Sequence, residues 1–197
     1  MKFKFLVIGV LGVILTSFSY ANQKYKKSFE HQEKFILYKV ADLNNDGRKD
    51  VIAVTEHAAS NVQYGNIRTL IIFLRNKNNK LDEILRNPNV IACSKCSNFE
   101  SEPDPFAEKR ISVKNGKISI VQNFDIRFYP SIAIYSFKYQ PNTGHFMTKS
   151  AKHILYELAE DGKYKKHVSN HILKFGKRLD IFNPDWPSLI GIQDKFY

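Results

Sequence analysis

The feature that most constrains the fold is a series of short, β-rich segments separated by turn residues. Phe35–Val40 and Val51–Thr55 flank a tight polar loop, and an apolar run at 69–74 precedes the Asn- and Lys-rich stretch RNKNNK. Turn residues recur about every ten to fifteen positions along the chain. This spacing is typical of an antiparallel β meander or sandwich of short hairpins, so a mainly β fold is expected.

The middle of the chain predicts two hairpins. Alternating apolar residues surround Asn115-Gly116, a dipeptide that suits a type I′ turn, and residues 131–150 alternate in the same way around PNTG. The run NVIAC at 89–93 predicts one more strand. The acidic, proline-containing stretch 97–109 predicts a loop.

The tail from residue 151 onward is less regular. HILYEL, at 153–158, predicts a strand, whereas 167–182 fits either a short helix or an edge strand. We find no internal repeat of fixed period and no interior linker. A single mainly β domain over 34–197, after a polar lead-in at 22–33, is therefore expected.

The N-terminus has the form of a secretory signal peptide. Lys2 and Lys4 precede an uncharged apolar run, Phe5–Phe18, and Ser19-Tyr20-Ala21 places small residues where a signal peptidase cleaves. The alternative is an uncleaved membrane anchor, but the run has 14 residues and a spanning helix needs roughly 20. We expect cleavage after Ala21, a signal helix over 1–21 that is removed, and a periplasmic or secreted protein.

The chain is strongly basic. Its formal net charge of +11 falls to +9 without Lys2 and Lys4, a balance that favours anionic partners such as an acidic protein, an envelope polymer or a membrane surface. The strongest basic cluster is 163–178, with Tyr164 and Phe175 interleaved. A solvated face is the alternative for this cluster. No nucleic-acid motif is present, so nucleic acid is not an expected partner.

The two cysteines, Cys93 and Cys96, lie in ACSKCS. An exported chain meets an oxidising compartment, so a disulfide between them is expected, with a modest effect of about 2 kcal/mol and a local shaping role. A redox dithiol is the alternative, but such motifs follow a strand at the start of a helix in a βαβ fold. Zinc is less favoured, because two thiolates need two further ligands.

The segment DLNNDGRKD, residues 42–50, carries the clearest chemistry. Oxygen ligands at positions 1, 3 and 5, a glycine at position 6 and a backbone carbonyl at position 7 suit calcium. The expected ligands are Asp42, Asn44, Asp46, the carbonyl of Arg48, and Asp50. Position 12 is Ala53, which excludes an EF-hand. The alternative is a hydrogen-bonded turn without metal, since Asn and Asp cap their own backbone.

The same segment resembles the D-x-[DN]-x-D-G-x-x-D loop of FG-GAP and VCBS-type repeats, over VADLNNDGRKDVIAV. The resemblance implies a strand–loop–strand element that binds calcium. One loop does not imply a whole propeller. More broadly, residues 35 to 140 are similar to small exported proteins of Gram-negative bacteria, a similarity that brings no assigned activity. Asn at position 3 and two basic neighbours predict weak, structural binding, with a Kd of roughly 10⁻⁴–10⁻³ M.

Other candidate sites are weaker. His167 and His171 are spaced i, i+4 but lack the glutamate of an H-E-x-x-H motif. Glu100, Glu102 and Asp104 lie in a proline-containing loop, which gives no reason to expect a pair of carboxylates across a cleft. We therefore expect a non-catalytic binding or structural module of the cell envelope. An envelope-polymer hydrolase and a thiol oxidoreductase remain alternatives.

Overall fold

The computed structural model describes residues 33–58, 65–95, 104–126, 129–171 and 177–184. The chain forms two compact units, Met1–Glu33 and Lys34–Tyr197. All elements below belong to the second unit. The expected signal helix lies outside the described residues. None of the described helices has the length and apolar character needed to span a membrane.

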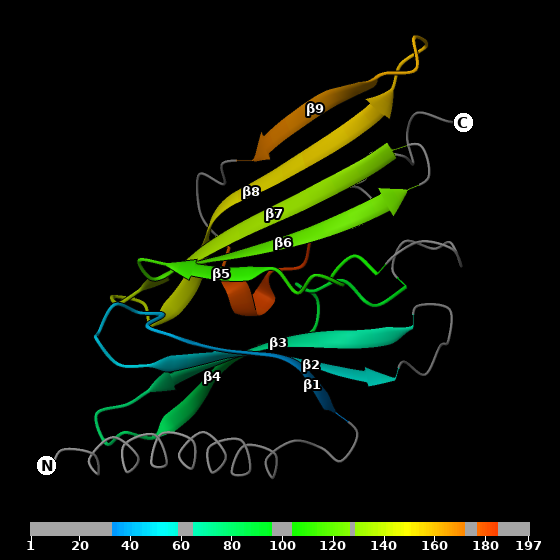
Figure 1. Ribbon diagram of the computed structural model, residues 1–197. Helices are drawn as coiled ribbons and strands as arrows, with labels where there is room; N and C mark the ends of the chain where they lie inside the picture. Colours follow the sequence, from blue (N-terminus) through cyan, green and yellow to red (C-terminus); the bar gives the residue numbers. More distant parts are fainter. Residues whose placement is uncertain (1–32, 59–64, 96–103, 127–128, 172–176, 185–197) are drawn as a thin grey trace, which may run out of the picture. The chain divides into compact units, whose positions relative to one another are not determined.

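The second unit contains two antiparallel sheets, each a meander of sequence neighbours (Figure 1). The first sheet consists of β1 (Lys34–Ala41), β2 (Asp50–Ala58), β3 (Asn66–Arg75) and β4 (Leu81–Asn87). The second consists of β5 (Ile111–Lys114), β6 (Lys117–Ile126), β7 (Tyr129–Gln140), β8 (His145–Leu158) and β9 (Tyr164–His171). A short 3₁₀ helix, η2 (Leu179–Ile181), follows β9. The expectation of a mainly β fold is confirmed.

The turn chemistry of the sequence accounts for the hairpins. Asn115 and Gly116 have φ values of 52° and 67°, the two positive values that a type I′ turn requires. They join Lys114 to Lys117, which pair across β5 and β6. The hairpin predicted at 131–150 is also present, as β7 and β8.

Three expectations about secondary structure need correction or refinement. Residues 89–93 form no strand; Val90, Ile91 and Ala92 are buried in an irregular segment after β4. HILYEL lies inside the longer β8, and His167–His171 belongs to strand β9, not to a helix.

The core is one cluster of apolar side chains drawn from both sheets. The first sheet contributes Ile52, Val54, Leu70 and Ile72, and the second contributes Ile118, Ile120, Phe124 and Phe137, together with other residues. Phe182, after η2, packs edge-on against Tyr135 and Phe137, with ring centroids 5.2 Å apart in each pair. Burial of this shared cluster is the main force that holds the two sheets together.

Buried polar side chains connect segments that no strand pairing joins. Gln122, fully buried on β6, accepts a hydrogen bond from the Ala92 N–H at 2.6 Å and donates to the Val90 carbonyl at 3.0 Å. Asn87, fully buried at the end of β4, donates to the carbonyls of Leu179 and Phe182. These two side-chain amides supply hydrogen bonds to backbone groups of 90–92 and of the η2 segment, which in the strands come from neighbouring strands.

Arg68 makes the main buried ionic contact. Only 4% of its side chain is exposed, and it binds Glu56 and Asp104 at 3.0 Å and 2.5 Å. It also donates to the Ala92 carbonyl, and its guanidinium lies over the Phe106 ring. Burial alone would lower the pKa of Arg68, but the two carboxylates outweigh burial and raise it above its usual value. The network fixes the segment after residue 104 against the first sheet.

Candidate functional site

The Asp42–Asp50 loop joins β1 to β2, as the sequence predicts. Asn45 and Gly47 have positive φ values of 61° and 84°, which reverse the chain within a few residues. Leu43, fully buried, anchors the loop in the shared core.

Asp50 forms the base of the loop. Its side chain is fully buried, and its two carboxylate oxygens accept hydrogen bonds from the Leu43 and Arg75 N–H groups, each at 2.8 Å. Burial is the largest influence on its pKa and raises it; the charges of Asp46 and Asp42 raise it further, against the two hydrogen bonds. Asp50 therefore connects the loop to β3 by a hydrogen bond, and burial makes ionisation of its carboxyl group less favourable than in water.

The remaining oxygens of the loop accept hydrogen bonds from the loop itself. Asp42 accepts from the Asp46 and Gly47 N–H groups at 3.2 Å and 2.9 Å, and Asn44 accepts from Asp46 at 3.1 Å. Asp46 accepts from the Arg48 N–H at 2.9 Å and pairs with the Arg48 guanidinium. Burial opposes ionisation of Asp46, but the hydrogen bonds from Arg48 and Asn44 and the charge of Arg48 outweigh it, so its pKa is lowered.

This arrangement matches the hydrogen-bonded turn more closely than a formed metal site. Within the described ranges, no group of three or more His, Cys, Asp and Glu residues is placed to hold a metal ion. The Arg48 guanidinium pairs with Asp46 Oδ2, and the Arg48 N–H donates to Asp46 Oδ1, so both oxygens of this expected ligand already have partners. The residue types fit calcium, but Asp46 would have to turn away from Arg48 first. Calcium binding stays a prediction.

The loop also contacts the second sheet. The Asn45 amide donates to the Asn115 carbonyl at 3.4 Å. A Cβ added at Gly116 would lie 2.8 Å from Asn45 Oδ1. The candidate calcium loop and the β5–β6 turn are thus in direct contact, which the sequence alone does not indicate because the two segments are 70 residues apart.

Those of the other candidate residues whose side chains the structure describes do not come together in a site. His167 pairs with Glu157 at 3.1 Å, and both are about half exposed. Asp104 is bound to Arg68. Cys93 is buried, with 9% of its surface exposed. Cys96, Glu100 and Glu102 lie outside the described residues, so the disulfide stays a prediction.

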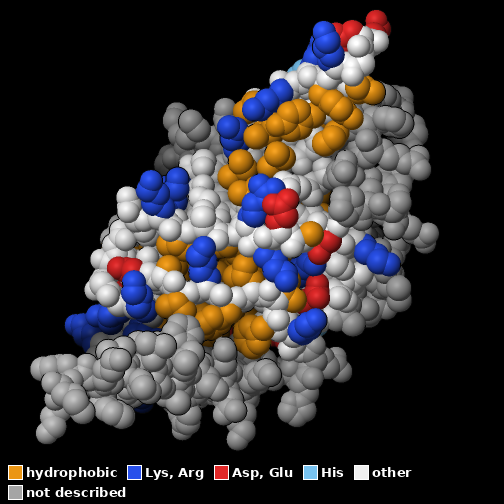
Figure 2. All heavy atoms as spheres, viewed as in Figure 1, with side chains coloured by type: hydrophobic (Ala, Val, Ile, Leu, Met, Phe, Trp, Pro, Cys, Tyr) orange, Lys and Arg blue, Asp and Glu red, His pale blue; other side chains and the backbone are white. Residues whose placement is uncertain are grey.

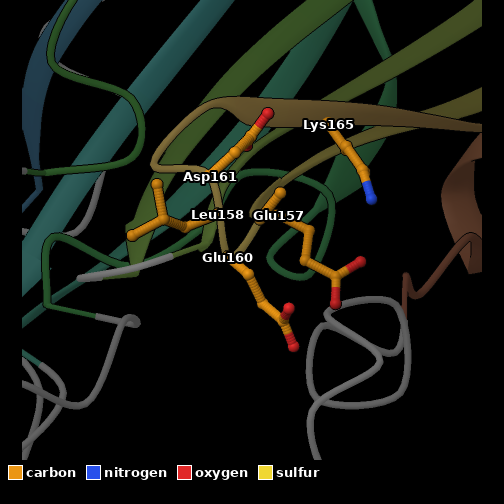
Figure 3. Close-up of a pocket in the computed structure, with 6 residues that line it drawn as sticks. Glu157, Leu158, Glu160, Asp161 and Lys165 are labelled. Carbon is orange, nitrogen blue, oxygen red and sulfur yellow. The ribbon is translucent and has the colours of Figure 1, made fainter.

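A pocket lies at the turn between β8 and β9 (Figure 3). Its lining includes Glu157, Glu160, Asp161 and Lys165. In Figure 3 Asp161 points away from Glu157 and Glu160, so the three carboxylates do not converge on one point. General acid–base catalysis needs groups that face a common substrate atom, so this arrangement does not suggest an active site.

A further surface feature is the outer face of the second sheet, the face turned away from the shared core. On β7, β8 and β9 the register places Ile132, Ile154 and Val168 in one row on this face; of these, Val168 is exposed, Ile132 is partly buried and Ile154 is buried. The next rows are Tyr156 with Lys166 and Leu158 with Tyr164. Figure 2 shows hydrophobic side chains gathered along β8 and β9 with basic side chains beside them.

Comparison of the chain with protein-family models, with curated proteins and with solved structures finds no match. The resemblance of the loop to FG-GAP and VCBS-type repeats therefore rests on the sequence pattern alone.

Proposed function

We propose that this chain is an exported, non-catalytic binding module of the bacterial cell envelope that recognises an anionic partner through the outer face of its second sheet. The observation that carries the proposal is the composition of this face. The charged side chains that the strand register places on this face are Lys114, Lys117, Lys138, Lys152 and Lys166, and the register places no described carboxylate beside them.

The opposite face of the β8–β9 hairpin differs, because it carries an acidic side chain beside its basic ones. There Glu157 lies across from Lys165 and pairs with His167. Basic groups on that face are therefore compensated by a neighbouring acid, whereas Lys152 and Lys166 on the outer face have no described carboxylate as a partner. Uncompensated lysines beside exposed apolar groups favour an anionic partner.

Binding of labelled poly-L-glutamate, followed by fluorescence anisotropy, tests this function. We expect salt-sensitive binding that weakens about fivefold or more in the Lys152→Gln/Lys166→Gln variant. The matched control, Lys165→Gln/Lys77→Gln, removes the same charge elsewhere and should change affinity less than about twofold. Equal weakening in both variants would show attraction by net charge alone, and the proposed binding face would be wrong.

Calcium binding by the Asp42–Asp50 loop is the structural part of the proposal. The site would be held by Asp42, Asn44, Asp46, the Arg48 carbonyl and Asp50, and the ion would neutralise crowded carboxylates. Millimolar calcium, compared with EGTA, should raise the Tm of the processed protein by several degrees. Asp46→Ala should abolish this shift and Asp161→Ala, in another Asp-Gly turn, should keep it. An unchanged Tm with calcium would leave the loop as a metal-free turn.

Export and the disulfide complete the proposal. Expression of the full chain in a Gram-negative host should yield a periplasmic protein whose first residue is Asn22. Intact mass under non-reducing conditions should be two hydrogens lower than after reduction, which reports a Cys93–Cys96 bond. A cytoplasmic protein that begins at Met1 would contradict export, and two free thiols in a periplasmic protein would contradict the disulfide.

A further inference from the structure

The outer face of the second sheet carries a group of exposed apolar side chains on β8 and β9. Val168, Leu158 and Tyr164 expose 43%, 41% and 54% of their surfaces. They lie on neighbouring strands, and Leu158 pairs directly with Tyr164. Exposed apolar side chains that are grouped on one face mark an interaction surface, whereas single scattered ones do not.

Lysines border this apolar group on the same face. Lys166 lies between Tyr164 and Val168 on β9, and it pairs across the strands with Tyr156. Lys152, two positions before Ile154 on β8, extends the border. The alternating side chains of a strand place all of these residues on one side of the sheet.

The use of lysine rather than arginine on this face helps to distinguish a lipid surface from a protein as the partner. Protein interfaces are enriched in arginine and depleted of lysine, because a lysine is costly to desolvate and fix. The described basic groups on this face are all lysines. Lysine suits a lipid surface, where its apolar stem lies along the acyl boundary and its ammonium reaches the headgroups. Tyr156 and Tyr164 have the amphipathic side chains found at membrane–water interfaces.

We propose that the outer face of the second sheet binds the surface of a bilayer that contains anionic phospholipid. Val168, Leu158 and Tyr164 enter the headgroup layer, and Lys152 and Lys166 lie beside lipid phosphates. The contact is made by the face of the sheet and not by the tip of the hairpin, since the tip carries Glu160 and Asp161. This inference rests on the proposed function, because it names the anionic partner of the same face.

Flotation with lipid vesicles tests this inference. The full chain is expressed, and the protein is used as purified, whether or not the host has removed the signal peptide. Phosphatidylcholine vesicles with about one third phosphatidylglycerol should bind the protein at about 0.15 M salt, and pure phosphatidylcholine vesicles should not. Binding to the anionic vesicles should fall severalfold at about 0.5 M salt.

Variants of the face separate this contact from attraction by net charge. Lys152→Gln/Lys166→Gln and, separately, Tyr164→Thr/Val168→Thr should each lower the bound fraction about fivefold or more. Lys165→Gln/Lys77→Gln is the matched control and should bind like the unaltered protein. Threonine keeps the strand preference of β9, and an unchanged Tm would verify that each variant is folded.

The remaining outcomes overturn the inference. Equal loss in the control variant would indicate attraction by net charge. A dimer in sedimentation velocity that Tyr164→Thr/Val168→Thr dissociates would assign the face to a second copy. Binding of poly-L-glutamate without binding of vesicles would overturn the lipid partner while the proposed function stands, and binding of neither would overturn both.

Discussion

Asp50 is a buried carboxylate whose two oxygens each accept one peptide N–H, from Leu43 and from Arg75. Asn at this position offers one acceptor oxygen and turns an NH₂ group toward the other N–H. We expect Asp50→Asn to lower the free energy of unfolding by about 1–3 kcal/mol, measured by urea denaturation. Asp82→Asn, at an exposed carboxylate, is the control. Equal stability of the two variants would contradict the anchoring role.

The raised pKa of Asp50 has a defined consequence for stability. Burial, with the charges of Asp46 and Asp42, raises the pKa in the folded chain above the value of 3.8. The folded state therefore binds this proton more tightly than the unfolded state. The contribution of Asp50 should be most favourable below pH 3.8 and should be lost as pH rises through the folded pKa. NMR titration of its carboxyl carbon tests the direction, and a midpoint below 3.8 would contradict it.

At the scale of elements, the contact between the Asp42–Asp50 loop and the β5–β6 turn can be isolated with glycine substitutions. Gly116 and Gly144 have similar positive φ values of 67° and 70°. A Cβ at Gly116 would meet Asn45, whereas a Cβ at Gly144 has nothing within 4 Å. Both alanine variants carry backbone strain, about 1–2 kcal/mol each. Gly116→Ala should cost up to about 1 kcal/mol more, because the exposed Asn45 amide must move aside and give up its contact with Asn115.

A double variant completes this test. Asn45→Ala removes the side chain that the new Cβ would meet, so it should recover part of the loss in Gly116→Ala and none of the loss in Gly144→Ala. Chemical denaturation of the unaltered protein, Asn45→Ala, Gly116→Ala and the double variant gives the coupling energy, and the same cycle with Gly144→Ala is the control. A coupling near zero would mean that the loop and the turn do not touch in solution.

The elements that the sequence predicts correctly are those set by local chemistry. Alternating residues around Asn115-Gly116 predict the β5–β6 hairpin, and the polar residues at 42–50 predict the β1–β2 loop. The prediction of a strand at 89–93 is wrong because apolar content reports burial, not strand pairing. There the hydrogen bonds come from the side chain of Gln122, which lies some 30 residues away.

The site was predictable only in part for the same reason. The loop residues are contiguous, so their grouping is visible in the sequence. The pairing of Arg48 with Asp46 and the contact of Asn45 with Asn115 depend on rotamers and on the docking of two sheets. The outer face emerges only from the strand register, because its residues come from five strands. The buried position of Arg68 also runs against the usual exposure of arginine.

At the scale of the whole unit, the shared core predicts that both sheets unfold together. Gln122→Ala removes the partner of a buried N–H and a buried C=O, so a loss of about 2–5 kcal/mol is expected. Asn123→Ala, one position along and on the other face, should cost about 1 kcal/mol or less. Hydrogen exchange of Gln122→Ala should accelerate in both sheets. Acceleration confined to β6 and its neighbours would contradict a shared core.

The meander topology has a consequence for the order of assembly, which would matter most if the chain is exported unfolded, as we propose. Within each sheet, every described strand pairs with its neighbour in sequence, so each hairpin can close once its second strand has appeared, with little loop-closure entropy. The side chain of Asn87, by contrast, depends on a much later segment. Its acceptors on Leu179 and Phe182 lie 92 and 95 residues later. We expect the docking of η2 against Asn87 to be a late step of assembly, because both acceptors of this side chain lie near residue 180.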